Sequence, residues 1–459
     1  MHKYPARREI DLSKFTGSEG PFETRYGLPE TVSYCNKCVV SNQRPVGAVE
    51  FKHTKQSIKK TVQFDGENVC NACRYAEKKW STFDWDAKEE ELKDICARHR
   101  RTDGAFDCIV SGSGGKDSFF AAHILKYKYG MHPLTVTWAP HIYTDWGWKN
   151  FQRWIHAGFE NILVHPNGLT HRLLTRLALE NLLHPFQPFI LGQKGISPKI
   201  AHKYKIPLIF YGEYEVDLSK KTHSKIQDAS FYTNKNADDI VLAGLSIGEL
   251  KENFGLTNND VRPYLPIMED EKNDFQCEVH YLGYYLRWHP QHNYYYAVEH
   301  GNFEAAPERT PGTYTKYNSI DDKLDDLHYY TTFMKFGIGR ATYEAFAEIR
   351  CGDLTREEGV ALVKKYDGEF PERFIDELFA YLSVPASQYP EAHARFEQPV
   401  MDRAYFDNLC DSFRSPHLWK WTGTGWELRH PIWKEGTGES VHAEGWRGNQ
   451  YASYRKDVP

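Results

Sequence analysis

The chain has 459 residues, a length typical of about three domains and sufficient for a large buried core. Its 57 basic and 62 acidic residues give a formal net charge of -5, so no overall positive field favours nucleic acid as a partner. No apolar run has membrane-spanning length, and residues 1–9 lack the apolar core of a signal peptide. We therefore expect a cytoplasmic protein without membrane insertion.

The N-terminal part of the chain predicts an irregular arm followed by a metal-binding module. Residues 1–30 are polar, rich in Gly and Pro and without periodicity, and two Cys-x-x-Cys pairs follow within residues 31–80. Four thiolates match the ligands of a tetrahedral structural Zn²⁺, here Cys35, Cys38, Cys70 and Cys73. The pairs are 31 residues apart, more than the roughly 15–20 of a common zinc ribbon, and a redox role stays open for either pair alone.

A glycine-rich segment lies between a predicted strand, residues 106–110, and a predicted helix, residues 119–126. It reads Ser111-Gly112-Ser113-Gly114-Gly115-Lys116-Asp117-Ser118. Glycines let backbone N–H groups approach an anion, and the positive end of the helix dipole points to the same place, so these eight residues predict a phosphate site. Lys116 adds a positive charge, and Asp117 a possible ligand for Mg²⁺. An ordinary turn that binds nothing is the alternative.

Residues 81–270 alternate between strand-like and helix-like segments, which predicts an α/β domain with a doubly wound parallel sheet. The expected strands after the loop are residues 133–138, 161–164, 188–191 and 207–211, and the expected helices are residues 148–157, 170–183 and 197–205. Ligands of such sheets bind at the carboxyl ends of strands. The candidate residues there are Thr137 and Trp138 for adenine, then Gln193, Lys194, Gly212, Glu213 and Glu215. Solvent-facing turn residues are the alternative reading.

The rest of the chain is predicted to be mainly helical and rich in aromatic residues. We divide it into a substrate or partner region, residues 271–385, and a linker with a Trp-rich tail, residues 386–459. Four basic residues are candidates for binding an anionic part of a substrate, with surface charge as the equal alternative: Arg309, Lys316, Lys335 and Arg340. The Trp-rich tail is compatible with sugar stacking, partner docking or core packing.

Two resemblances sharpen these expectations. The segment Ser113-Gly-Gly-Lys-Asp-Ser118 resembles the loop of the PP-loop ATP pyrophosphatases. With the cysteine pairs, Leu134–Pro140, Phe186–Lys194, Phe210–Glu213, Lys335–Arg340 and Tyr366–Glu369, it resembles the N-acetyl sugar amidotransferases of bacterial surface-polysaccharide biosynthesis, including lipopolysaccharide O-antigen. Tyr214 departs from the Asn that the pattern usually has, which puts the identity of the sugar in doubt.

The second resemblance implies a reaction and its participants. AMP is transferred from ATP to the acetamido oxygen of a nucleotide-linked N-acetyl sugar, and ammonia then replaces that oxygen to give an acetamidino group. The residues implied for catalysis are Lys116, Asp117, Lys194 and Glu213. The chain has neither a cysteine at position 2 nor a Gly-x-Cys-x-Gly motif. The resemblance therefore implies a separate glutaminase subunit and a cyclase-like subunit that delivers ammonia, as in imidazole glycerol phosphate synthase.

Two other functions stay open at this stage. Transfer-RNA thiolation enzymes also join zinc knuckles to a PP-loop, but they commonly need clustered cysteines, whereas Cys277, Cys351 and Cys410 are far apart in this sequence. The negative net charge also disfavours a polyanionic partner. A non-catalytic zinc-ribbon interaction protein is the second alternative, although a purely structural turn would need neither Lys116 nor Asp117.

Overall fold

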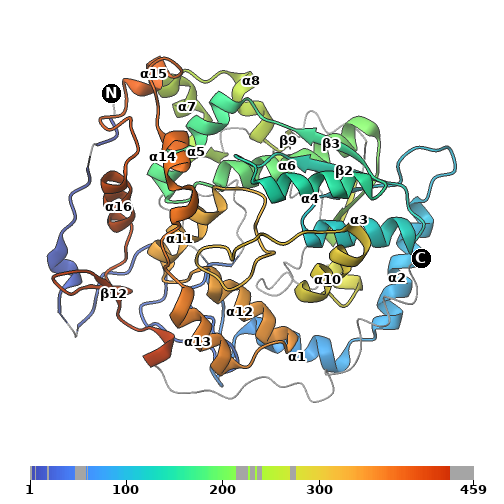
Figure 1. Ribbon diagram of the computed structural model, residues 1–459, viewed down its shortest axis with the longest axis horizontal. Helices are drawn as coiled ribbons and strands as arrows, with labels where there is room; N and C mark the ends of the chain where they lie inside the picture. The colour runs from blue at the N-terminus through green and yellow to red at the C-terminus, as the bar shows by residue number, and fades with distance from the viewer. Residues whose placement is uncertain are drawn as a thin grey trace.

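The fold is taken from a computed structural model, which describes residues 3–5, 7–17, 20–46, 58, 60–212, 226–227, 233–234, 240–268, 275 and 277–434. Along the chain, helices alternate with the strands of a central sheet, and further helices extend the molecule on one side (Figure 1). Within these ranges every helix is too short or too polar to span a lipid bilayer.

The central sheet has the strand order β3-β2-β1-β4-β10-β5. Its first five strands pair in parallel, and β5 pairs antiparallel at the edge. The bounds are β1 Cys108–Ser111, β2 Pro133–Trp138, β3 Glu160–Val164, β4 Leu208–Tyr211, β5 Ile226–Gln227 and β10 Glu278–Tyr281. The strand order reverses between β1 and β4, where a doubly wound sheet opens a crevice for ligands. The predicted α/β fold is confirmed.

Alternate side chains of the strands point to opposite faces of the sheet, and each face packs in a different hydrophobic core. On β1, Cys108 and Val110 belong to one hydrophobic cluster and Ile109 to another, as a period of two requires. The first face is covered by α2 Trp85–His99, α3 Lys116–Tyr127, α4 Asp145–His156, α9 Leu282–Tyr285 and α10 Pro290–Gly301. The second is covered by α5 Gly168–Leu182 and α6 Gln187–Tyr204, which lie between the strands and the C-terminal helices.

The strand predicted at residues 188–191 is wrong, because these residues form the start of α6. Pro188 occupies one of the first two helical positions, where a missing N–H is tolerated. Buried positions then recur along the helix to Ala201, and Gly192 packs directly on the ring of Trp138. The short apolar run was too brief to distinguish a buried strand from a buried helix.

The C-terminal region is largely helical and packs against the sheet domain. Its helices are α11 Asp325–Phe336, α12 Arg340–Cys351, α13 Arg356–Tyr366, α14 Ile375–Leu382, α15 Pro390–His393 and α16 Arg403–Ser412. Short elements complete the fold: η1 Leu12–Phe15, α1 Asn71–Thr82, β6 Thr233–Asn234, β7 Val241–Leu242, β8 Leu245–Ser246, α7 Ile247–Phe254, α8 Asn258–Val261, η6 Arg262–Tyr264, β9 Ile267–Met268, η8 Glu372–Phe374, β11 Trp419–Trp421, β12 Trp426–Leu428 and η9 Ile432–Lys434.

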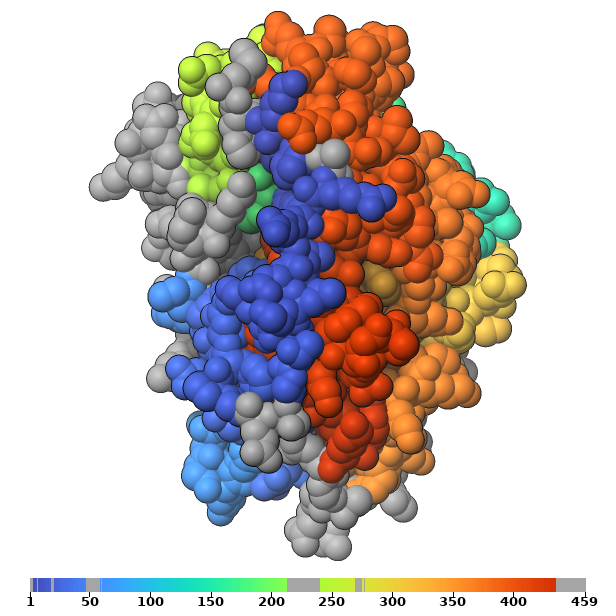
Figure 2. Space-filling model, turned by 90° about the vertical axis from the view of Figure 1, so that its left-hand side faces the viewer, coloured from blue at the N-terminus to red at the C-terminus, as the bar shows by residue number. Residues whose placement is uncertain are grey.

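The two ends of the described chain pack together. Figure 2 shows the N-terminal arm, in blue, running along the orange and red C-terminal segments. Tyr4 forms a parallel bridge with Phe396, and the main-chain N–H of Arg8 donates to Asn408. The hydrophobic cores include residues from both sides of each predicted domain boundary, so the division at residues 30, 80, 270 and 385 stays a prediction.

Candidate nucleotide site and four-cysteine cluster

The glycine-rich loop lies between the carboxyl end of β1 and the first turn of α3. Gly115 is the N-cap of α3 and supplies no side-chain cap, which leaves the first N–H groups of the helix without a capping side chain. A Cβ on Gly112 would lie 2.1 Å from Cβ of Ser118, and one on Gly114 would lie 2.8 Å from Cα of Phe151. Gly114 also has φ +85°, in the left-handed region. The loop therefore depends on glycine and presents backbone donors to an anion.

Lys116 and Asp117 form the charged part of the loop. The buried ammonium of Lys116 pairs with one carboxylate oxygen of Asp117, whose side chain stays about one-third exposed. The other oxygen of Asp117 accepts a 2.8 Å hydrogen bond from the side-chain amide of Asn293 on α10. Ser118 donates its hydroxyl to the carbonyl oxygen of Gly115 and so stabilises the first turn of α3. The carboxylate is thus held in one orientation from two sides.

The loop faces the switch point of the sheet. Gly212 follows β4, and a Cβ there would lie 2.7 Å from the carbonyl oxygen of Asp117. The backbone after β4 therefore passes directly against the loop after β1, as expected of a ligand crevice at this edge. The predicted Glu213 and Glu215, and the unusual Tyr214, lie outside the described residues.

Helix α6 brings two predicted residues to the same edge of the sheet. Ser197 of α6 shares a 2.5 Å hydrogen bond with Ser111, the last residue of β1, and Gly192 contacts Trp138, the last residue of β2. Gln193 and Lys194 lie between these two contacts and are partly exposed. They lie in the middle of a helix, so the prediction that they follow the end of a strand is wrong.

The two residues predicted to contact adenine point to opposite sides of the sheet. The hydroxyl of Thr137 accepts a 3.0 Å hydrogen bond from Asn161 on β3. The ring of Trp138 packs among Gly192, His171 and Tyr264 on the α6 side. Their side chains are engaged within the fold, so a ligand at the end of β2 would meet mainly backbone groups of these residues.

A residue from the C-terminal region, Asp321, contacts the loop. Burial raises the pKa of the Asp321 carboxylate, and the nearby hydroxyl of Ser113 opposes this rise. A Cβ on Gly147, in the first turn of α4, would lie 2.4 Å from Cα of Asp321, so the segment lies tightly against α4. Sequence reasoning missed both Asp321 and Asn293. The only signal was the repeated acidic pair in Asp321-Asp322-Lys-Leu-Asp325-Asp326.

The four basic residues predicted for substrate binding are not brought together. Arg309 forms a two-pronged ion pair with Glu369, and Lys316 donates to the carbonyl oxygen of Pro307. Lys335 is buried and donates to the carbonyl oxygen of Leu182 at the end of α5.

Arg340 is the one of the four whose charge acts on Asp321. It is buried and pairs with Glu344 at 2.6 Å. Burial raises the pKa of Asp325 to about 7, and the positive charge of Arg340 opposes this rise. Its charge acts on Asp321 in the same way. Arg340 thus offsets the negative charge of Asp321 and Asp325.

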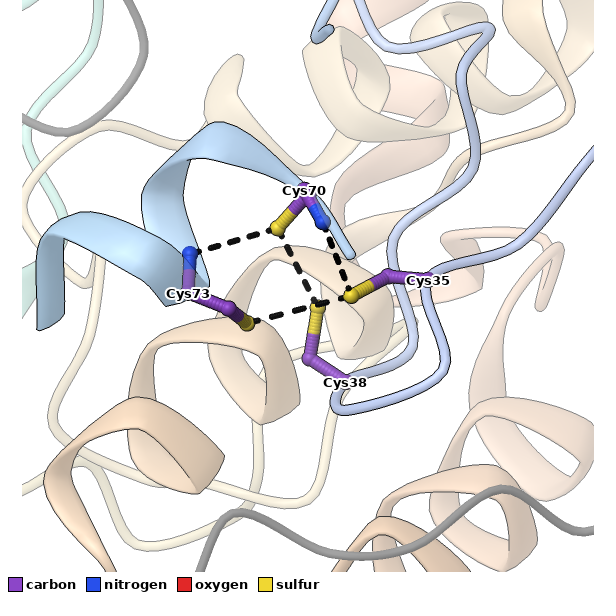
Figure 3. Close-up of side chains that lie close together, drawn as sticks. All are labelled: Cys35, Cys38, Cys70 and Cys73. Carbon is purple, nitrogen blue, oxygen red and sulfur yellow. Dashed lines mark hydrogen bonds between the residues drawn. The ribbon is translucent and has the colours of Figure 1, made fainter. Parts of the chain in front are cut away.

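The four predicted metal ligands do come together (Figure 3). The sulfur atoms of Cys35, Cys38, Cys70 and Cys73 all lie within 4.8 Å of one another, and all four residues are buried. The N–H of Cys70 donates to the sulfur of Cys35 at 3.2 Å. Four thiols at this spacing surround one point, so the cluster can hold a metal ion with the Cys₄ ligand set.

The cluster is anchored to the C-terminal region. Its hydrophobic surroundings include Phe346 and Ile349 of α12 and Val363 of α13. The Nε of Arg356, in the first turn of α13, donates to the carbonyl oxygens of Cys35 and Cys38 at 3.3 Å each. A small cavity beside Val39 of the module is lined by residues of α12, α13 and the C-terminal tail. It lies away from the glycine-rich loop, and so does a larger groove of about 740 Å³ between α2 and His280.

The segment that contributes Asp321 is similar to a known protein family. Residues 311–431 match the family described as LPS biosynthesis protein WbpG-like, C-terminal domain. This segment is similar to the WbpG-like C-terminal domain. The match supports the predicted resemblance to proteins of surface-polysaccharide biosynthesis. The WbpG-like domain includes α11 to α16 and the β11–β12 hairpin, and through Asp321 it reaches the glycine-rich loop.

Two further comparisons are limited in extent. The uncharacterized protein MJ1599 of Methanocaldococcus jannaschii is 32% identical over 84 residues, which are 18% of this chain and 29% of that protein. The chain thus matches less than a third of this curated relative. The U34-tRNA thiolase NcsA from Methanococcus maripaludis, solved with its [4Fe-4S] cluster, gives a TM-score of 0.24 at 12% identity, covering 69% of this chain and 89% of that chain. A TM-score this low supports no argument about function.

Proposed function

We propose that this protein is an ATP-dependent amidotransferase that converts a sugar acetamido group to an acetamidino group in the biosynthesis of lipopolysaccharide O-antigen or a related surface glycan. One observation carries the proposal. Asp321 of the WbpG-like domain and Gly114 of the glycine-rich loop both pack against α4, where a Cβ on Gly147 would lie 2.4 Å from Cα of Asp321 and one on Gly114 would lie 2.8 Å from Cα of Phe151. The domain associated with lipopolysaccharide biosynthesis and the loop suited to phosphate therefore contribute to the same site.

The loop fits a nucleotide triphosphate. Gly112, Gly114 and Gly212 each stand where a Cβ would collide with neighbouring atoms, so backbone groups line the site closely. The uncapped N-terminus of α3 and the ammonium of Lys116 stabilise negative charge on the departing pyrophosphate. Asp117 is the described carboxylate placed to hold Mg²⁺, which when bound would offset phosphate charge and orient the phosphates.

The proposed reaction overcomes the low reactivity of an amide. Its carbonyl carbon is a poor electrophile and its oxygen a poor leaving group, so ammonia alone does not form an amidine. Transfer of AMP to the oxygen makes it a good leaving group. The chain's part is to hold ATP and the sugar in line and to exclude water while the adenylated sugar waits for ammonia.

The ammonia supply and the metal complete the proposal. No glutaminase motif occurs in the sequence, so we propose that a separate glutaminase and a cyclase-like subunit deliver ammonia. The Cys₄ cluster fits a structural Zn²⁺, because four thiolates leave no open coordination position. Thiolation enzymes commonly need a further pair or cluster of cysteines. The post-loop cysteines Cys277, Cys351 and Cys410 belong to no metal-ligand group among the described residues.

The test supplies ammonium directly. The purified protein is incubated with ATP, Mg²⁺, high ammonium chloride and a panel of nucleotide-linked diacetamido sugars, and the products are measured by mass spectrometry. We expect AMP and a sugar lighter by about one mass unit, since NH replaces O. Asp117→Ala should abolish both products, whereas Asp103→Ala, at an exposed surface carboxylate, should not. Release of AMP stimulated by transfer RNA, with no change in any sugar, would instead support thiolation.

A further inference from the structure

Two buried histidines beside the carboxyl end of β2 each leave one ring nitrogen without a hydrogen bond. His141 follows β2, and His171 lies on α5. Their rings stack with centroids 4.5 Å apart and planes at 23°. Within the described part of the chain, Nε2 of each ring is buried and has no partner. Buried polar atoms are nearly always paired, so two unpaired nitrogens on a pair of stacked rings point to a ligand.

The protonation of His141 is fixed by Asp322. Nδ1 of His141 lies 2.7 Å from Oδ2 of Asp322, and both side chains are almost fully buried. Main-chain N–H groups of His141, Ile142 and Leu324 also donate to this carboxylate, at 2.7, 3.4 and 3.0 Å. A carboxylate surrounded by donors accepts from the imidazole as well, so Nδ1 carries the proton. In the neutral ring Nε2 of His141 then carries the lone pair, as in the base of a catalytic dyad.

In His171 the proton is on the other ring nitrogen, Nε2. Its Nδ1 lies 2.9 Å from the hydroxyl of Tyr264, a fully buried side chain whose pKa burial raises well above its ordinary value. That hydroxyl keeps its proton and, among the residues described, has no acceptor other than His171. Burial, together with the neighbouring His141, lowers the pKa of His171 well below its usual range, so the ring is neutral. Nδ1 therefore accepts, and Nε2 of His171 carries an unused N–H.

The dipeptide Asp321-Asp322 connects the histidine pair to the glycine-rich loop. Asp322 binds His141, while the carboxylate of its neighbour Asp321 lies near Ser113, whose hydroxyl opposes the rise in the pKa of Asp321 that burial causes. The carbonyl oxygen of Asp321 also accepts a 3.1 Å hydrogen bond from the N–H of Thr144, the N-cap of α4. On the α6 side, the ring of Phe189 stacks against His141 and the ring of Phe186 packs against it at a tilt. The unpaired nitrogens thus lie in aromatic surroundings, and Asp321 and Asp322 connect them to the proposed site of ATP.

We propose that His141 is the base that accepts a proton from ammonia when it attacks the activated acetamido carbon, and that the Nε2–H of His171 donates to the acetamido oxygen. This inference rests on the proposed amidotransferase function. In the step, the lone pair of ammonia forms the C–N bond, the C–O bond to AMP breaks, and AMP leaves with that electron pair. One proton of ammonia passes to Nε2 of His141 and from there to solvent. Asp322 is a positioning residue that holds the proton of the neutral ring on Nδ1, so that Nε2 faces the ammonia, and it stabilises the imidazolium that forms.

The experiment separates the two halves of the reaction. Sugar-dependent exchange of labelled pyrophosphate into ATP reports adenylation without ammonia, and mass spectrometry with ammonium chloride reports amidine formation. For His141→Gln we expect amidine formation to fall by about 10²–10⁴-fold while exchange stays within about threefold of wild type. His417→Gln is the matched control, because that buried histidine has both nitrogens paired, with Ser415 and Gln43. It should change neither rate by more than about twofold.

A spectroscopic readout tests Asp322 independently of activity. In protein labelled with ¹⁵N-histidine, His141 should show the tautomer protonated at Nδ1, and Asp322→Asn should remove that preference and slow amidine formation. Equal loss of both half-reactions in His141→Gln, with a lower melting temperature, would assign the residue a structural role and overturn the inference. Unchanged amidine formation would overturn it too. A wild-type protein that forms no amidine would refute the proposed function itself, and the inference with it.

Discussion

The side-chain amide of Asn293 donates a 2.8 Å hydrogen bond to Asp117, a residue 176 positions earlier in the chain. Asn293 is buried on α10, which packs along α3. With Lys116 on the other carboxylate oxygen, this bond leaves Asp117 little freedom to rotate. The orientation of the loop carboxylate is therefore set from a helix outside the loop.

We predict that Asn293→Ala slows ATP-dependent AMP formation about tenfold, because Asp117 loses one of the two contacts that orient it. The melting temperature should change little, since only one partly exposed hydrogen bond is lost. Asn259→Ala, at an exposed position on α8, serves as the control. Steady-state assays of AMP release check this, and equal rates in the two variants would contradict it.

We predict that removing the metal from the Cys₄ cluster destabilises more than the cysteine module. Cys38→Ser, or prolonged chelation, should lower the free energy of unfolding by at least about 3 kcal/mol, because metal binding stabilises only the folded ligand set. The effect should reach α12 and α13, which pack on the cluster. Calorimetry combined with metal analysis tests this. Cys277→Ser, outside the cluster, should retain one Zn²⁺ per chain, and an unchanged melting transition in Cys38→Ser would refute a structural metal.

We predict that Glu348 makes stability fall as pH rises from about 4.5 to about 7. Burial raises the pKa of Glu348 to about 7 from an ordinary 4.5, against the opposing effect of a hydrogen bond from Tyr314. Between these values the folded state binds a proton that the unfolded state has lost, so stability declines with pH.

Glu348→Gln removes this titration. Relative to wild type, the variant should therefore gain about 1–3 kcal/mol between pH 4.5 and 7.5 and show no further change above that. Urea unfolding at several pH values measures the difference. A constant difference across the range would show that Glu348 does not take up a proton on folding.

We predict that Arg176→Ala is among the most destabilising single changes in the chain. The side chain of Arg176 is fully buried, pairs with Glu180 at 2.8 Å, and donates to the carbonyl oxygens of Leu382, Gln398 and Pro399. Its removal leaves Glu180 as a buried carboxylate with less compensation, at a cost of about 3–5 kcal/mol.

The double variant Arg176→Met, Glu180→Met tests the cause of that loss. It removes both charges and keeps most of the side-chain volume, so urea unfolding should show a smaller loss than for Arg176→Ala alone. An equal or larger loss would mean that the contacts to the C-terminal carbonyl oxygens, and not the isolated charge, dominate.

The loop and its helix were predictable because their signals are local. Residues 106–126 contain a buried run, a glycine turn and an apolar helical period in direct succession, and the structure has β1, the loop and α3 there. The cysteine cluster was predictable from two short motifs for the same reason. Helix α6 was misassigned at its start, because four apolar residues fit both a strand and a helix.

The remainder of the site was not predictable because it depends on contacts between distant segments. Asn293 and Asp321 reach the loop from 176 and 208 residues away from Asp117 and Ser113, and no local pattern encodes such a distance. The basic residues show that a local pattern can also mislead. Lys335 has a charge and flanking glycines, yet it donates to the last turn of α5, because a buried carbonyl oxygen there needs a donor.

The two hydrogen bonds from Arg356 to the carbonyl oxygens of Cys35 and Cys38 also bear on how the protein is made. Arg356 is synthesised 318 residues after Cys38. At typical rates of translation, roughly 15–60 s separate the two. During that interval the cysteine pairs exist without the helices that later enclose them, so their thiols are open to oxidation or to a wrong metal. Early capture of the right metal would then protect the nascent chain, and the yield of folded protein should depend on zinc supply during synthesis and not only afterwards.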